Sequence, residues 1–192
     1  PHLGGVSAGA RGDIPFHDFE IGKRGSKMND AVGLEATGRP LVVFSLDDQR
    51  YALALERVQR CIHVVAITPL PESPPIVLGI IDLGGVVIPV INLRERFNHP
   101  PRGVRLSDHL VIAETRKRTV ALLVDETNGV IEVSPEIYAP AGEILPRLEL
   151  MDGAAKLEDG LVLIHDLERL LSLEEDAEID RALSAIAGPE TP

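Results

Sequence analysis

The sequence predicts an all-β fold that ends in a helix. The chain contains about nine or ten short runs rich in valine, isoleucine and leucine, each of strand length and separated by turn residues. A helical pattern takes over from His165 onward, where the leucines at positions 167, 170, 171 and 173 share one face. A series of short strands is typical of a β-sandwich or of small barrels, and a polar break near residue 100 favours two sub-barrels packed together.

The first strands are predicted to form a hairpin. Apolar runs at 41–46 and 51–55 flank the polar turn 47–50. Residues 56–61 have helical spacing and predict a short helix. A strand is expected again at 64–68, where apolar residues return.

The clearest hairpin spans residues 77–94 and follows a segment, 69–75, whose four prolines predict an extended connection. Its two β-branched runs are separated by Gly84 and Gly85, which reach positive φ at little steric cost and allow a reversal in two residues. Pro89 lies in the second run and cannot donate a hydrogen bond to a neighbouring strand. We therefore expect this strand to be bent there, or to lie at an edge or a bulge.

The second half predicts more strands and then a helix. A helical turn is expected at 94–97, and Asp166 is the predicted N-cap of the helical segment that begins after His165. Residues 174–187 extend or follow that helix. Between these points the predicted segments are a loop at 98–107, strands at 109–114, 119–125 and 129–133, an irregular stretch at 134–147, and strands at 148–153, 154–157 and 161–164.

Composition limits the classes of function. The 192 residues carry a formal charge of −11 and the basic residues are scattered, so no nucleic-acid partner is expected. Cys61 is the single cysteine, which excludes an internal disulfide and fits a reducing compartment. No apolar run approaches the roughly 18 to 20 residues of a spanning helix, and no signal peptide pattern is present. We expect a cytoplasmic protein without direct membrane insertion.

The predicted organisation has three parts. Residues 1–38 follow neither a helical nor a strand period and are expected to form a flexible tail. Met28 follows a Gly-Ser-Lys stretch, so our hypothesis is that it is the natural start and that residues 1–27 are vector-derived. A domain is expected over 39–173, with a boundary between sub-barrels near 95–107, followed by a helical or flexible extension over 174–192.

The sequence offers little for catalysis. Cys61 has no third group to orient it with a base, so a structural cysteine is expected. Asp82, Asp125 and Glu126 end predicted strands, where acids ordinarily form turns. No metal site is expected, because no two histidines of the predicted domain have the helical spacing of a metal pair: His63, His99, His109 and His165.

The order of seven sequence pieces resembles the chemotaxis coupling protein family, the CheW-like adaptors, over residues 39–187. The pieces are LVVFSL with YAL (41–46, 51–53), VQ (58–59), VLGIIDLGG (77–85), VIPVINLR (87–94), LLVD (122–125), GV (129–130) and LVLIHDLERLL (161–171). The resemblance implies two intertwined five-stranded SH3-like barrels with a C-terminal helix. It also implies a non-catalytic adaptor without a cofactor, which joins the cytoplasmic tip of a chemoreceptor to the regulatory domain of a CheA-like histidine kinase.

Partner-facing positions follow from the same resemblance. Leu55, Val58 and Cys61 match apolar contact positions of the family, with ordinary core packing as the other interpretation. Two further places depart from the family pattern. Arg60 stands where an acidic residue is usual, and the turn formed by Asp82, Leu83, Gly84 and Gly85 stands where Asn-Leu-Arg-Gly is usual. Loss of an arginine and reversal of a charge should change partner choice, so the receptor or output is expected to be non-standard.

Two alternatives stay open at this point. One is a CheW-like regulatory module detached from a histidine kinase or another signalling protein. The other is a β-barrel enzyme that uses Asp125 and Glu126 as paired carboxylates, which requires a pocket enclosing both side chains.

Overall fold

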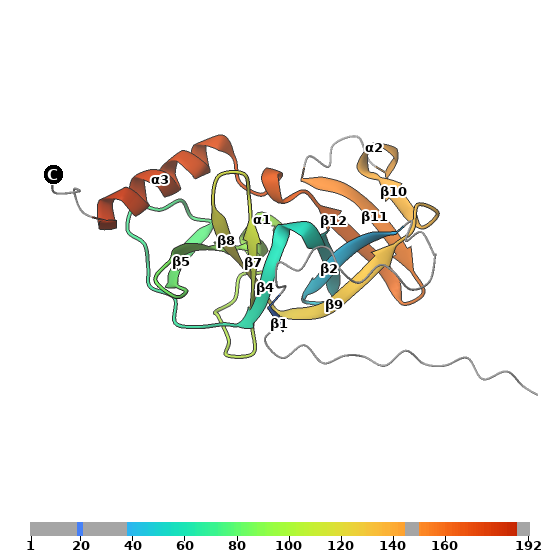
Figure 1. Ribbon diagram of the computed structural model, residues 1–192, viewed down its shortest axis with the longest axis horizontal. Coiled ribbons are helices and arrows are strands. Elements are labelled where there is room, and N and C mark those ends of the chain that lie inside the picture. The colour runs from blue at the N-terminus through green and yellow to red at the C-terminus, as the bar shows by residue number, and fades with distance from the viewer. Residues whose placement is uncertain (1–18, 21–37, 145–149, 188–192) are drawn as a thin grey trace, which may run out of the picture.

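The computed structural model describes residues 19–20, 38–144 and 150–187, and within them the chain forms two sheets that lie side by side (Figure 1). The first sheet has the strand order β1-β4-β7-β8-β6-β5 and the second β10-β11-β12-β3-β2-β9. Each sheet thus has five main strands and one short additional strand, β1 or β10. The mainly β class and the two-part architecture predicted above are confirmed.

The strand bounds are as follows. The first sheet contains β1 (Phe19–Glu20), β4 (Val58–His63), β5 (Val77–Asp82), β6 (Val87–Asn92), β7 (His109–Glu114) and β8 (Thr119–Val124). The second contains β2 (Arg39–Leu46), β3 (Gln49–Ala54), β9 (Glu126–Val133), β10 (Tyr138–Pro140), β11 (Met151–Leu157) and β12 (Gly160–His165). The helical elements are η1 (Leu55–Arg57), α1 (Leu93–Arg96), α2 (Ala141–Ile144), η2 (Leu167–Arg169) and α3 (Leu173–Ala187).

Among the described strands the chain changes sheet between β1 and β2, between β3 and β4, and between β8 and β9. The loop 98–107 joins α1 to β7 and therefore connects two parts of the same sheet. The boundary expected near 95–107 does not coincide with a change of sheet. A polar break in the sequence marks a loop. Where the chain crosses from one sheet to the other depends on which strands pair, and those strands can be far apart in the sequence.

Three hydrophobic cores explain why the strands are continuous apolar runs. A shared core is formed by side chains from both sheets, among them Phe44 and Leu53 from the second and Val111 and Leu122 from the first. A second core, with Ile164, lies within the second sheet and a third lies within the first. Neighbouring residues of one strand enter different cores, so strands buried on both faces lose the apolar–polar alternation of a one-sided sheet.

The central hairpin forms as predicted. Gly84 and Gly85 have φ of 66° and 87°, and the Leu83 N–H donates to the Val86 carbonyl at 2.9 Å, which closes a two-residue turn. Pro89 is paired with Ile80 of β5 and lies one residue before β6 begins its parallel ladder with β8. A residue without an N–H is therefore placed outside that ladder, in agreement with the expected restriction.

Two predictions of local structure were wrong. Only Leu55–Arg57 is helical, as one 3-10 turn, and Val58–His63 is a strand rather than the end of a helix. Pairing of β4 with β7 overrides the weak local helical spacing. The segment 64–68 forms a single bridge from Thr68 to Ile80 in place of a strand.

The C-terminal part differs in detail from the prediction. The stretch 134–147 contains β10 and α2, and 151–157 is one strand rather than two, whereas residues 145–149 lie outside the described residues. Asp166 is an N-cap as predicted, although of η2, and its carboxylate accepts from the Glu168 N–H at 3.0 Å. The predicted tail 1–38 lies outside the described residues except for β1 and Gly38, as does the hypothesis of a start at Met28.

Helix α3 packs on the first sheet, and its start is locally encoded (Figure 1). Ser172 and Glu175 form a capping box: the Ser172 hydroxyl accepts from the Glu175 N–H at 3.2 Å, and the Glu175 carboxylate accepts from the Ser172 N–H at 2.7 Å. Ile179 and Ala182 enter the shared core. Residues 173–187 are therefore helical and docked.

Candidate partner-binding surface

The partner-facing residues expected after the first hairpin divide into buried and accessible ones. Val58 and Cys61 are both 4% exposed and belong to the shared core. Burial raises the pKa of the Cys61 thiol to about 11, so it remains protonated and unreactive at neutral pH. Leu55 and Arg60 are half-buried. Strand β1 pairs with β4 at these positions, with Glu20 opposite Arg60, so a partner would reach the half-buried side chains of Leu55 and Arg60 rather than the backbone of β4.

The second group of expected residues lies at the tip of the β5–β6 hairpin. Asp82, Gly84 and Gly85 are exposed, and the Asp82 carboxylate accepts from the Gly85 N–H at 2.7 Å, which fixes the turn. Val86 and Val87 are 57% and 47% exposed directly after it. The tip thus offers two apolar side chains beside an acidic turn, where an arginine would present a cation.

The two groups occupy opposite ends of the strand order in the first sheet. Strand β4 is one edge of the five main strands and β5 is the other. The connection between them bends back, and Thr68 and Ile80 exchange two backbone hydrogen bonds of 2.9 and 2.8 Å. The two groups are therefore close in sequence but lie at two separate places on one sheet, the β4 side and the hairpin tip.

A polar cluster joins the two sheets where their turns meet. Arg94 of α1 is 5% exposed and donates to Asp47, in the β2–β3 turn, at 2.6 and 3.0 Å. It also donates to Asp125, between β8 and β9, at 2.5 and 3.2 Å. Arg102 links Asp125 to the buried Asp108. We call Asp47, Arg94, Arg102, Asp108 and Asp125 the junction cluster.

The junction cluster favours the ionised form of Asp47 and of Asp125. Hydrogen bonds from Arg94 lower the pKa of Asp47 to about 2. Burial acts to raise the pKa of Asp125, but hydrogen bonds from Arg94 and Arg102 outweigh it and the net shift is downward. Asp125 therefore fits a structural anion better than a proton donor. Glu126 is the next residue and is exposed at the start of β9, so the two acids proposed for an enzyme do not act as a pair.

An aromatic stack lies beside the junction cluster. Tyr51 stacks on Phe97 with ring centroids 4.7 Å apart, and Phe97 stacks on His165 at 4.3 Å. His99 lies within hydrogen-bond distance of the Tyr51 hydroxyl, at 2.6 Å, and of Asp47, at 3.0 Å. Burial lowers the pKa of His165 to about 4, and its Nδ1 bonds to the Leu150 carbonyl at 3.0 Å. His165 is therefore a neutral core residue.

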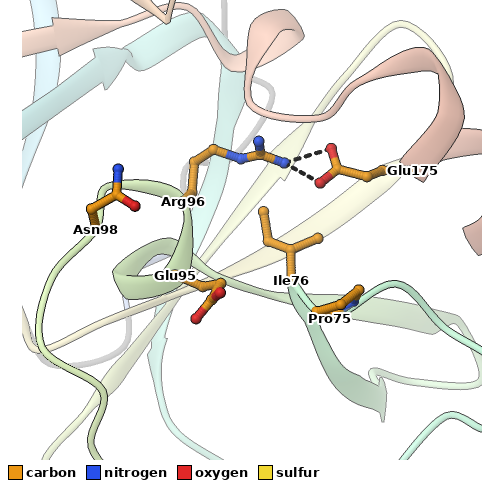
Figure 2. A pocket seen from close by; sticks show the side chains of 6 residues that line it. All are labelled: Pro75, Ile76, Glu95, Arg96, Asn98 and Glu175. Atoms are coloured by element: carbon orange, nitrogen blue, oxygen red, sulfur yellow. Dashed lines mark hydrogen bonds and ion pairs between the residues drawn. The ribbon is translucent and has the colours of Figure 1, made fainter.

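A cavity of about 340 Å³ separates α1 from the start of α3 (Figure 2). It is lined by Pro75, Ile76, Glu95, Arg96, Asn98 and Glu175. Arg96 and Glu175 point toward one another in Figure 2 and are joined by two hydrogen bonds of 2.6 and 2.5 Å. This ion pair links α1 to the start of α3 across the cavity.

The described residues contain neither a cluster of three or more potential metal-ligating acids, histidines or cysteines nor a helix long and apolar enough to cross a membrane. What they do present is the β4 side of the first sheet, where β1 pairs with β4, together with an apolar hairpin tip and a polar junction. Sequence reasoning missed the junction cluster because its members are separated by up to about 80 residues. The one local signal was Arg94, an arginine directly after a buried apolar strand.

The comparisons with known proteins agree with this arrangement. A family model described as a CheW-like domain matches residues 40–175. The chain is 33% identical to the chemotaxis protein CheW of Bacillus subtilis over 140 residues, which covers 72% of this chain and 90% of that protein. It is 30% identical to a probable chemotaxis protein CheW of Rhizobium etli over 139 residues, covering 71% of this chain and 90% of that protein.

A solved structure gives the same result. The scaffolding protein TtCheW of Thermoanaerobacter tengcongensis is 31% identical and superimposes with a TM-score of 0.66, covering 72% of this chain and 95% of that one. The family model spans the strands of both sheets and the start of α3. With the two-sheet fold and these matches, the chain belongs to the CheW-like domain family.

Proposed function

We propose that this chain is a non-catalytic adaptor that joins the cytoplasmic tip of a methyl-accepting chemoreceptor to the regulatory domain of a CheA-like histidine kinase. The observation that carries the proposal is the match to chemotaxis CheW proteins over most of their length and through both sheets. In this proposal the protein is cytoplasmic and its partners recruit it to receptor arrays. No bond is made or broken in this role.

The proposed contacts lie on the first sheet. On the β4 side, Leu55 and Arg60 are both half-buried and are the accessible members of the expected contact set. At the hairpin tip, Val86 and Val87 flank a turn without a cation. An arginine presents a fork of donors that glycine cannot, so these two places are the sites at which partner choice differs from that of family members with the usual residues. The proposed receptor or output is accordingly a non-standard one.

Binding of purified partners tests the proposal. We expect the chain to bind the cognate kinase regulatory domain and the receptor tip in pull-down and calorimetry, and Arg60→Glu and Gly84→Arg to shift affinity for at least one of them. Arg181→Glu is the matched control, because Arg181 carries the same charge on the far part of α3 and its side chain is 75% exposed. Failure to bind either partner at high micromolar concentration would rule the adaptor role out. Equal effects of Arg60→Glu and the control on affinity would show that the β4 side is not part of the interface.

A further inference from the structure

Two imidazoles face each other across β4 and β7. His63 is the last residue of β4, His109 is the first of β7, and the two are register partners. Their ring centroids are 4.6 Å apart and the rings are tilted by 34°. The two residues are 46 positions apart in the sequence, so no local spacing brings this pair to notice.

The backbone explains the close approach. The Val64 N–H donates to the Asp108 carbonyl at 2.9 Å, immediately outside the histidine pair. A cross-strand pair flanked in this way is of the non-hydrogen-bonded type, in which the Cα atoms are only about 4.5 Å apart and side chains come closest. The two histidines are thus held together by the strand ladder, with no need for contacts of their own.

One nitrogen of the pair is left without a hydrogen bond. Nδ1 of His109 is buried and has no partner among the described residues. A neutral imidazole that carries its proton on Nε2 offers the Nδ1 lone pair to an ion. A buried polar atom without a partner is destabilising, and a bound ion at Nδ1 would remove that cost.

We propose that His63 and His109 form a binding site for a divalent transition-metal ion of the zinc and nickel type. Two imidazole nitrogens that share one zinc lie about 3.3 Å apart, given Zn–N bonds of roughly 2.0 to 2.1 Å in tetrahedral geometry. The exposed side chain of His63 is free to turn toward this spacing, since its ring is not enclosed by core packing. Because Nδ1 of His109 is buried in the ion-free structure, binding requires His63 to turn and open this nitrogen to water, which then completes the coordination shell.

The surroundings favour a cation. The carboxylates of Glu126 and Asp108 act electrostatically on His109 in the direction that stabilises positive charge. Cys61, on the same face of β4, is held in the core as a protonated thiol and does not compete as a ligand. A bound ion would tie the end of β4 to β7 and so fix the strand that carries Arg60. The inference does not depend on the adaptor role.

Thermal unfolding of the full chain with and without zinc tests the site. We expect zinc at ten times its dissociation constant to raise Tm by about 3–6 °C, with a further rise that follows the logarithm of the zinc concentration. The His63→Ala and His109→Gln variants should each lose this rise. His63 is exposed, so His63→Ala is expected to keep the metal-free Tm of the parent, which separates loss of a ligand from loss of the fold.

A second variant controls for other histidines. His17→Gln removes an imidazole from the N-terminal segment, outside the described residues, and should leave the zinc response unchanged. A zinc response retained in His63→Ala, or lost in His17→Gln, would show an adventitious ion only. No response at millimolar zinc would overturn the proposal directly, whatever the outcome of the partner-binding experiments.

Discussion

The side chain of Arg94 makes polar contacts with turns that belong to both sheets. Its guanidinium bonds to Asp47 of one sheet's turn and to Asp125 at the crossing between sheets. A buried arginine is tolerated only when its donors are paired, and here two carboxylates and the Pro100 carbonyl accept them. The same residue was recognisable in the sequence as part of a family motif, but its partners were not.

Removal of the Arg94 charge is predicted to destabilise the fold strongly. Arg94→Met leaves Asp47 and Asp125 without their main donor, and we expect a loss of about 3 kcal/mol in the free energy of unfolding, measured by urea denaturation. Arg50→Met is the matched control, because Arg50 pairs with Asp159, whose side chain is 70% exposed. That pair should contribute less than about 1 kcal/mol. Equal losses in the two variants would contradict a special role for the junction cluster.

The buried imidazole of His165 predicts a pH dependence of stability. Its pKa is about 4 in the folded protein and about 6.5 in the unfolded chain, so the unfolded chain binds a proton first as pH falls. The contribution of His165 to the free energy of unfolding is fully present above about pH 6.5 and declines by about 3 kcal/mol as the pH falls to 4. Asp47, with a pKa of about 2, contributes to losses only at lower pH.

Urea midpoints between pH 4 and 7 check this dependence. In His165→Phe the slope in that window should be much reduced, with a remainder from His109, whose pKa burial also lowers. An unchanged slope in His165→Phe would assign the acid sensitivity to other groups. A flat profile in the parent would show that His165 stays accessible to protons in the folded state.

At the scale of elements, local signals succeeded where one residue type decides the backbone. Gly84 and Gly85 form the predicted turn, and Asp166 is the predicted N-cap, although of η2. They failed at 56–61, where helical spacing is weaker than pairing of β4 with β7. Strand β5 shows a further tertiary effect at Gly79, where a bulge brings the chain against Thr68.

Substitution of Gly79 is predicted to break this contact. Its φ is 151°, and a Cβ there would lie 2.2 Å from the Thr68 carbonyl oxygen. We expect Gly79→Ala to lower the free energy of unfolding by at least about 2 kcal/mol, from combined backbone strain and overlap. Gly103→Ala, with no atom within 4 Å of the added Cβ, should change it by less than about 0.5 kcal/mol. An unchanged free energy of unfolding in Gly79→Ala would show that the segment 64–68 can move away from β5 at little cost.

At the scale of the whole molecule, the shared core makes the two sheets one folding unit. Phe44 and Leu53 of the second sheet pack in the same cluster as Val111 and Leu122 of the first. Either sheet alone would expose this cluster to water, at about 25 cal/mol for each Å² of apolar surface. We therefore expect a single cooperative unfolding transition.

Tyrosine fluorescence provides a direct test, because both tyrosines, Tyr51 and Tyr138, lie in the second sheet and the chain has no tryptophan. Ile112→Ala removes a fully buried side chain from the core of the first sheet and should cost about 2–5 kcal/mol. We expect the tyrosine signal to report the same loss as far-UV circular dichroism. A tyrosine midpoint that stays at the parent value would show that the sheets unfold independently.

The sequence by itself determined the strand-rich class, the central hairpin, the N-cap at Asp166 and the family resemblance. Each of these depends on residues close together in the chain or on the order of short motifs. Only the tertiary structure decided that β4 is a strand, that Val58 and Cys61 lie in the shared core, and that Arg94 meets Asp47 and Asp125. These features arise from strand pairing and burial between distant segments, and the energies of such contacts exceed the local preferences that a sequence pattern can reveal.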